Sequence, residues 1–364
     1  MRLHPTLLLS LLLPGLAAAA DYPRHILPAT QVQAAVEESK DEPLRYAVAL
    51  PTNLNAPDGS WDSPADGIAR WRLGIESQGA ESLALRLEDL RLPAGSALRW
   101  VGEDSGDVQG PFVAADSGTL WLPVVRGARA VLEVRLPAAL REQFGLRIAE
   151  AQHGYRGFDQ ANTAKGQFGR SSSCNIDVAC STANDWRTQV RSVVLLTANN
   201  VARCTGTLVN NTEENLKPYI LTANHCKFGS DDFPISGVRA YFNVNRQGCG
   251  SGGVGDITQT IKAAELVAQN ATSDIALLLL QDPLNGPRVT DFNVFFAGWD
   301  AGASIPTSGA AIHHPAGDDK KISTYRNAAT RENNVQIGRN NSPDKFFVDA
   351  WMVIWSQGST QPGS

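Results

Sequence analysis

The residues best suited to chemistry lie in two short segments, Leu221–Cys226 and Ala271–Leu278. The first follows an apolar run and predicts a buried strand that ends in a turn directly before His225. An imidazole held at such a turn can act as a general base. Asp274 stands immediately before a second apolar run, where a carboxylate can accept the imidazole N–H and fix its tautomer. We therefore expect His225 and Asp274 to form a catalytic pair.

The order His then Asp resembles that of trypsin-like serine proteases, in which a serine follows. Four further segments are similar to the secreted bacterial lysyl endopeptidases: Ser173–Cys180, Cys204–Thr212, Phe292–Asp300 and Ala311–Pro315. The resemblance covers about half of the chain, from Cys174 to its end. It implies an all-β protein with a chymotrypsin-like double β-barrel, a serine endopeptidase that hydrolyses proteins or peptides without a cofactor. Cleavage after basic residues is a narrower expectation.

The last four residues, Gln361–Ser364, resemble the approach to the nucleophile in that family, with Gln361 in place of an acid. The resemblance places the catalytic serine directly after Ser364 and gives the oxyanion hole to the N–H groups of Gly363 and that serine. We thus expect a second barrel that is incomplete, and a printed chain that is truncated and inactive. The alternative is a non-catalytic secreted β protein, either a decayed protease or a binding module.

The chain contains five cysteines, Cys174, Cys180, Cys204, Cys226 and Cys249. No two have the short spacing of a zinc knuckle, so disulfides are expected. The family resemblance implies the pairs Cys204–Cys226 and Cys180–Cys249 and leaves Cys174 unpaired. His313 and His314 are adjacent in an expected strand and would face opposite sides, so we predict no metal there.

Residues 1–20 have the pattern of a secretory signal, with a short leucine-rich core before four alanines. The apolar run is too short to span about 30 Å of hydrocarbon. We therefore expect export to the periplasm or the medium, where disulfides persist. The formal net charge of −5 gives no reason to expect nucleic acid or an anionic membrane as a partner.

The first half of the chain divides by its pattern. Residues 21–66 are expected to be an irregular lead-in, and alternating residues in 67–152 predict a β-sandwich. The sandwich contains no catalytic cluster, which favours a prosegment of a zymogen over a carbohydrate- or protein-binding module. Residues 153–170 are expected to be a linker with processing at Lys165–Gly166 or Arg170–Ser171, and 171–364 to be the protease domain. First-barrel strands are expected at 190–197, 204–210, 219–223, 238–243, 261–267 and 275–280, and the second barrel begins with 292–299.

Overall fold

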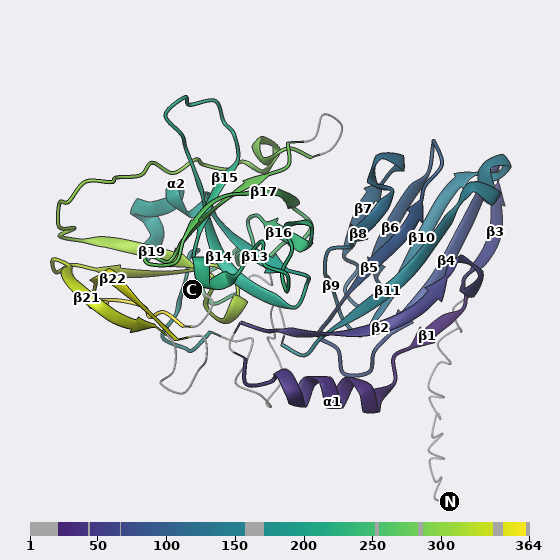
Figure 1. Ribbon diagram of the computed structural model, residues 1–364, viewed down its shortest axis with the longest axis horizontal. Coiled ribbons are helices and arrows are strands. Elements are labelled where there is room, and N and C mark those ends of the chain that lie inside the picture. The colour runs from purple at the N-terminus through teal and green to yellow at the C-terminus, as the bar shows by residue number, and fades with distance from the viewer. Residues whose placement is uncertain are drawn as a thin grey trace, which may run out of the picture.

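The computed structural model of the chain describes residues 21–42, 44–65, 67–156, 171–251, 255–282, 287–337 and 345–361. The expected signal segment, Lys165, Gly166, Arg170, Gly363 and Ser364 lie outside these residues. The described residues form two units side by side, a β-sandwich and a protease-like unit (Figure 1). No described helix has the length and apolar character needed to cross a membrane.

The sandwich consists of two mainly antiparallel sheets. One contains β1 (Arg24–Ile26), β3 (Ser60–Ala65), β4 (Ile68–Glu76), β6 (Ala97–Gly102), β7 (Val108–Phe112) and β10 (Arg129–Pro137), in the order β1-β4-β10-β6-β7 with β3 beside β4. The other contains β2 (Ala47–Asn55), β5 (Ser82–Arg91), β8 (Gly118–Trp121), β9 (Val125–Arg126) and β11 (Gly145–Gly154), in the order β2-β11-β5-β8 with β9 beside β5.

Strict alternation of side chains produces the sandwich core. In β10, Ala130, Leu132, Val134 and Leu136 are fully buried, while the residues between them face outward. Two tryptophans, Trp71 and Trp100, are buried in the same apolar cluster. Each such side chain contributes about 1.5–3 kcal/mol through burial, so the core needs no charged or catalytic group to hold it together.

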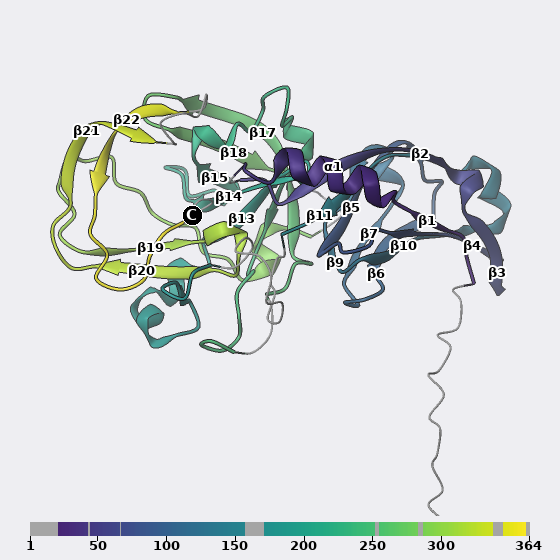
Figure 2. The same ribbon diagram turned by 90° about the horizontal axis from the view of Figure 1, so that it is seen from below.

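The sandwich begins earlier than we expected from the sequence. The segment 21–66, expected to be an irregular lead-in, contains β1, α1 (Ala29–Ser39), β2 and β3. Pro51 interrupts the apparent pattern of β2, but β2 is the outer strand of its sheet, where a missing N–H costs no ladder hydrogen bond. α1 lies beneath β2 in Figure 1 and faces the viewer in Figure 2.

The protease-like unit contains a closed barrel of six antiparallel strands. They are β13 (Val193–Ala198), β14 (Ala202–Val209), β15 (Tyr219–Thr222), β16 (Val238–Tyr241), β17 (Thr260–Asn270) and β18 (Ile275–Leu280), preceded by α2 (Arg187–Val190). Each lies where the sequence predicts a strand. The barrel order is β13-β14-β15-β18-β17-β16. β15 and β18 are therefore neighbours, with Thr222 opposite Ala276, although β16 and β17 lie between them in the chain.

The remaining strands form two smaller sheets. β12 (Ile176–Asp177), β20 (Lys321–Tyr325) and β19 (Gly309–His313) make a three-stranded sheet, and β21 (Thr330–Ile337) pairs with β22 (Phe346–Met352). Within the described residues these sheets do not close into a second barrel. The expectation that 292–299 begins a barrel strand is wrong: this segment is not a strand and forms only a single bridge, from Ala297 to Val209 of the first barrel.

A small apolar cluster joins the two units. It combines buried side chains of the sandwich unit, Tyr46, Ala47, Ala84 and Val124, with Leu195, Val201, Tyr241, Val244 and Ile257 of the barrel unit. Hydrogen bonds cross the same boundary: Val124 donates its N–H to the Tyr241 hydroxyl at 3.1 Å, and the Asn200 amide donates to Leu122 at 2.9 Å. The units therefore share a buried interface.

Candidate active site

His225 lies in a single 3₁₀ turn, Asn224–Cys226, at the end of β15. Lys227 ends this turn in the left-handed conformation, which redirects the chain immediately after the histidine. Cys226 is joined to Cys204 of β14 by a disulfide. The turn is thus held by β15 on one side and by the disulfide on the other. These two connections fix the position of the His225 backbone at the end of the barrel.

Asp274 occupies the tight connection from β17 to β18, with a φ of 50°. Its Oδ2 lies 2.7 Å from Nδ1 of His225, and its Oδ1 accepts the backbone N–H of His225 at 2.8 Å. The carbonyl of Asp274 also accepts the N–H of Asn224 at 3.2 Å. Three contacts therefore connect this one residue to the histidine turn, and the structure brings the two predicted side chains together.

This arrangement determines which ring nitrogen is available. An ionised carboxylate only accepts hydrogen bonds, so Nδ1 of His225 carries the proton and Nε2 keeps its lone pair. The Asp274 side chain is 18% exposed and that of His225 is 37% exposed. The acid is therefore shielded while the ring remains open to solvent, as a base that must meet a substrate requires.

An aromatic residue that the sequence analysis did not select covers one face of the imidazole. The ring of Phe346, the first residue of β22, stacks on His225 with 5.6 Å between centroids and 29° between planes. A strand from the C-terminal part of the chain thus helps to orient a residue of the first barrel. The only sequence signal is the aromatic pair Phe346-Phe347, which is equally typical of a core strand.

The disulfides form as the family resemblance implied. Cys180 is bonded to Cys249 and Cys204 to Cys226, and Cys174 is free and exposed. The sulfurs of Cys204 and Cys226 lie within 4.8 Å of a ring nitrogen of His225. Because both sulfurs are in the disulfide, they offer no thiolate to a metal ion.

The two adjacent histidines that could suggest a metal site are structural. His313 lies 3.3 Å from the Ser323 hydroxyl, and Nδ1 of His314 lies 3.0 Å from the Asp318 carbonyl. Burial lowers the pKa of His313 to about 4 and, with help from nearby Lys320, lowers that of His314 as well. Both rings are therefore neutral packing groups near neutral pH.

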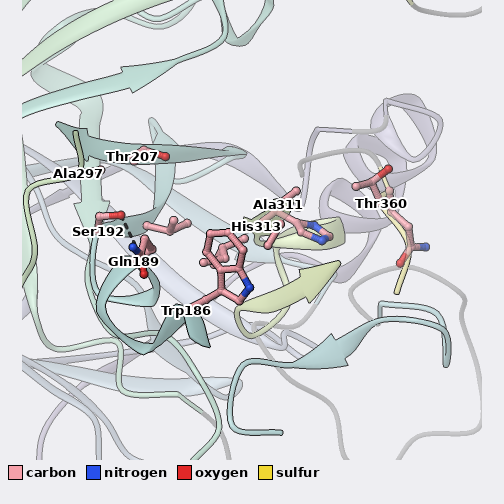
Figure 3. A pocket seen from close by; sticks show the side chains of 12 residues that line it. Trp186, Gln189, Ser192, Thr207, Ala297, Ala311, His313 and Thr360 are labelled. Atoms are coloured by element: carbon pink, nitrogen blue, oxygen red, sulfur yellow. Dashed lines mark hydrogen bonds between the residues drawn. The ribbon is translucent and has the colours of Figure 1, made fainter. Parts of the chain in front are cut away.

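A cavity of about 610 Å³ lies between the first barrel and the three-stranded sheet. Ser192 and Gln189 lie on one side of it and Thr360 on the other, with Trp186 and His313 between them (Figure 3). Neither His225 nor Asp274 lines this space. The cavity is thus separate from the His225–Asp274 pair, although Thr360 and Gln361 bring the end of the described chain to its edge.

We compared the sequence with profiles of known protein families. A profile described as the lysyl endopeptidase C-terminal domain matches residues 168–364, more than half of the chain. The chain belongs to the lysyl endopeptidase family. A second profile, the N-terminal domain of the same family, matches residues 23–154 and so covers the sandwich.

Individual relatives are more distant. A lysyl endopeptidase from Pseudomonas aeruginosa is 29% identical over 312 residues, which is 77% of this chain and 63% of that protein. This family member therefore spans less than two thirds of the length of that relative.

Solved structures with partial similarity are also serine or other proteases. The match to the active form of the Rv3671c protease from M. tuberculosis covers 56% of this chain and 76% of that protease chain, at 15% identity and a TM-score of 0.31. A thermostable serine protease from an extremophilic microorganism covers 48% and 83%, at 16% identity and a TM-score of 0.30. The architecture described above rests on its own strand order and not on these superpositions.

Proposed function

We propose that this protein is a secreted serine endopeptidase in which His225 is the general base and Asp274 orients it. The observation that carries the proposal is the double contact between them, from Oδ2 to the ring and from the backbone N–H to Oδ1. With both carboxylate oxygens engaged, the ring has a single orientation. Membership of the lysyl endopeptidase family supports the same chemistry.

The proposed reaction follows from the free Nε2 atom. The nucleophile is the serine that the resemblance places directly after Ser364. His225 takes its proton as the hydroxyl attacks a peptide carbonyl, and then gives that proton to the leaving amine. Asp274 stabilises the imidazolium formed between these steps. The N–H of Gly363, together with that of the nucleophile, binds the oxyanion.

The substrates are proteins or peptides, and the proposed cleavage is after lysine or arginine. The description of the family names lysine, one of these two residues. No cofactor, metal, nucleic acid or membrane enters the proposal. Two disulfides, which persist in oxidising compartments, support export to the periplasm or the medium.

We further propose that the sandwich is the prosegment of a zymogen, released by cleavage in the linker at Lys165–Gly166 or Arg170–Ser171. The two family profiles end and begin around this segment, at residues 154 and 168. An endopeptidase that cuts after basic residues could process either bond itself.

The decisive test is labelling by a fluorophosphonate probe, which reacts only with an activated serine. We expect the complete gene product to be labelled at the serine after residue 364, and His225→Ala to abolish the labelling. A polypeptide ending at Ser364 should remain unlabelled. Labelling at Ser364 itself would show that the nucleophile is placed one residue too late, and a processed gene product without any labelling would favour the non-catalytic alternative.

A further inference from the structure

A short segment of the sandwich unit pairs with the barrel beside His225. On the side away from β13, β14 pairs with β15 only at Thr207–Val209. Upstream, the same edge is taken by Leu44–Tyr46: Arg203 donates its N–H to Leu44 at 3.1 Å, and Tyr46 donates to Val201 at 2.9 Å. Arg45 and Ala202 form the antiparallel bridge between them. The edge 201–203 is thus a strand position filled by another part of the chain.

This edge lies next to the catalytic pair. Arg203 directly precedes Cys204, whose sulfur is within 4.8 Å of a ring nitrogen of His225. Leu44 packs against the buried cluster that contains Cys204 and Cys226. Because the pairing is antiparallel, Leu44 lies at the end nearer to His225, and the segment runs away from the imidazole toward Tyr46.

That direction is the one required of the part of a substrate that follows the cleaved bond. His225 protonates the leaving amine, so the residues after the bond start at the imidazole and extend away from it. An extended peptide adds to an open strand edge through main-chain hydrogen bonds, whatever its side chains. The edge 201–203 can therefore accept a substrate only when Leu44–Tyr46 is absent.

The segment cannot itself be cut, because the chain turns away before it reaches the histidine. Arg45 donates its N–H back to Glu42 at 3.3 Å, which closes a turn. The buried guanidinium of Arg156 donates to the carbonyls of Lys40, Glu42 and Arg45 and so holds this turn. This turn distinguishes the segment from an extended substrate, which would continue past the imidazole.

Close contacts among Tyr46, Arg203 and Gly317 hold the Tyr46 end of the segment. The guanidinium of Arg203 lies 5.0 Å from the ring centroid of Tyr46. Its other side faces Gly317, which has a φ of 67° and where an added Cβ would lie 1.9 Å from Arg203 Cδ. Only glycine allows this approach, so Arg203 is pressed between the two units and keeps Tyr46 on the edge.

We propose that the edge 201–203 is a peptide-binding edge for the leaving-group side of substrates, which Leu44–Tyr46 occupies as an uncleavable internal ligand until the sandwich is removed. This inference rests on the proposed function, since it assigns the edge to the substrate of His225 and Asp274. It predicts selective inhibition: the uncleaved protein should reject extended peptides but still accept substrates without residues beyond the cleaved bond.

The test uses the complete gene product kept uncleaved by Lys165→Ala and Arg170→Ala. Tyr46→Pro removes the N–H that bonds to Val201, and Tyr46→Ala removes the same ring but keeps the N–H. We expect Tyr46→Pro to raise kcat/KM for a lysine peptide with three residues beyond the cleaved bond by about tenfold over Tyr46→Ala, as the loss of a backbone hydrogen bond allows. A lysine p-nitroanilide, which ends at the cleaved bond, should be hydrolysed equally by both variants.

Hydrogen exchange gives a second measurement that needs no catalysis. The Arg203 N–H should exchange faster in Tyr46→Pro than in Tyr46→Ala, and an amidated peptide with the sequence of residues 44–49 should restore its protection. Arg156→Met, which leaves every pairing residue intact, should speed the same exchange if Tyr46→Pro does not fold. Equal Arg203 exchange in all variants, or no protection by the peptide, overturns the proposal. If no form hydrolyses any substrate, the proposed function fails, and the exchange result still decides whether the edge binds peptide.

Discussion

The sandwich and the protease-like unit both consist mainly of β-strands, but they differ in how many residues have unusual backbone dihedral angles. Among the described residues, the sandwich unit has one non-glycine residue with positive φ, Asp89, and the protease-like unit has ten. The ten are Asn199, Asn200, Glu214, Leu216, Lys227, Asn243, Asp274, Asn293, Ala316 and Asn334. Such conformations cost free energy and concentrate where structure serves function. Two of them, Asp274 and Lys227, flank the candidate active site.

This difference indicates that the backbone of the sandwich mainly supports a packed core, whereas turns of the protease-like unit also orient particular side chains. Alternating strands and buried tryptophans give the sandwich a regular core, and its one positive-φ non-glycine residue among the described residues, Asp89, lies outside that core. The barrel keeps an equally apolar interior but uses its turns to aim side chains. Substitutions in the two units should accordingly affect different quantities.

The largest effect is expected from Asp274→Asn in the processed, complete gene product. The amide would favour the wrong imidazole tautomer, and turnover should fall by about 10⁴-fold, the loss typical of such a triad. Steady-state kinetics on a lysine peptide measures it. Asp282→Asn is the matched control, because Asp282 is an exposed acid that pairs only with the surface residue Arg288 among its described contacts. A loss below tenfold for Asp274→Asn would mean that the acid does not orient the base.

A smaller effect, on stability alone, is expected from Trp71→Ala in the sandwich. The indole is fully buried and donates to the Ala56 carbonyl at 2.8 Å, so its removal should lower the free energy of unfolding of the sandwich by about 3–5 kcal/mol. Calorimetry of the uncleaved protein should show the loss, with kcat of the processed enzyme unchanged. Ile68→Ala, at an exposed position of the same strand, serves as the control. A change in kcat would contradict the separation of roles.

The double substitution Cys204→Ala with Cys226→Ala should have the smallest effect of the three. The disulfide joins residues 22 apart in sequence, and losing it should cost about 3 kcal/mol of unfolding free energy in the chain-entropy model. Urea denaturation of the protease-like unit in the processed protein measures this cost. The exposed, unpaired Cys174 provides the control: Cys174→Ala should leave the midpoint in place. An unchanged midpoint in the double variant would mean that strand pairing alone holds the histidine turn.

Regular features could be predicted from the sequence, and irregular ones could not. All six barrel strands lie where apolar runs predict them, and the His225–Asp274 contact could be expected from two strand ends in family order. The lead-in was misjudged because Pro51 breaks the pattern of an outer strand. The segment 292–299 is apolar because Phe292, Val294 and Phe296 pack against the barrel core, and periodicity cannot distinguish such a segment from a strand.

Contacts between residues far apart in the chain are the other features that the sequence did not predict. Phe346 stacks on His225 from 121 positions further along the chain. Strands at 335–338 and 346–355 can be expected from the sequence, but their contact with the histidine turn cannot. Lys320 is another example: it is fully buried, donates to the Val190 carbonyl at 2.8 Å, and has its pKa lowered by burial to about 7. A lysine in a charged run, Asp318–Lys321, is ordinarily expected at the surface.

The apolar cluster shared by the two units separates cutting of the linker from release of the sandwich, the two steps of the proposed processing. Cutting the linker breaks one peptide bond but leaves Tyr46, Val124, Tyr241 and their neighbours packed together. A nicked molecule is therefore still a complex, and its two pieces part only at the rate at which that cluster opens or the sandwich is digested. Under the proposed processing, maturation would therefore include a delay in which the sandwich stays bound to the cut protease-like unit.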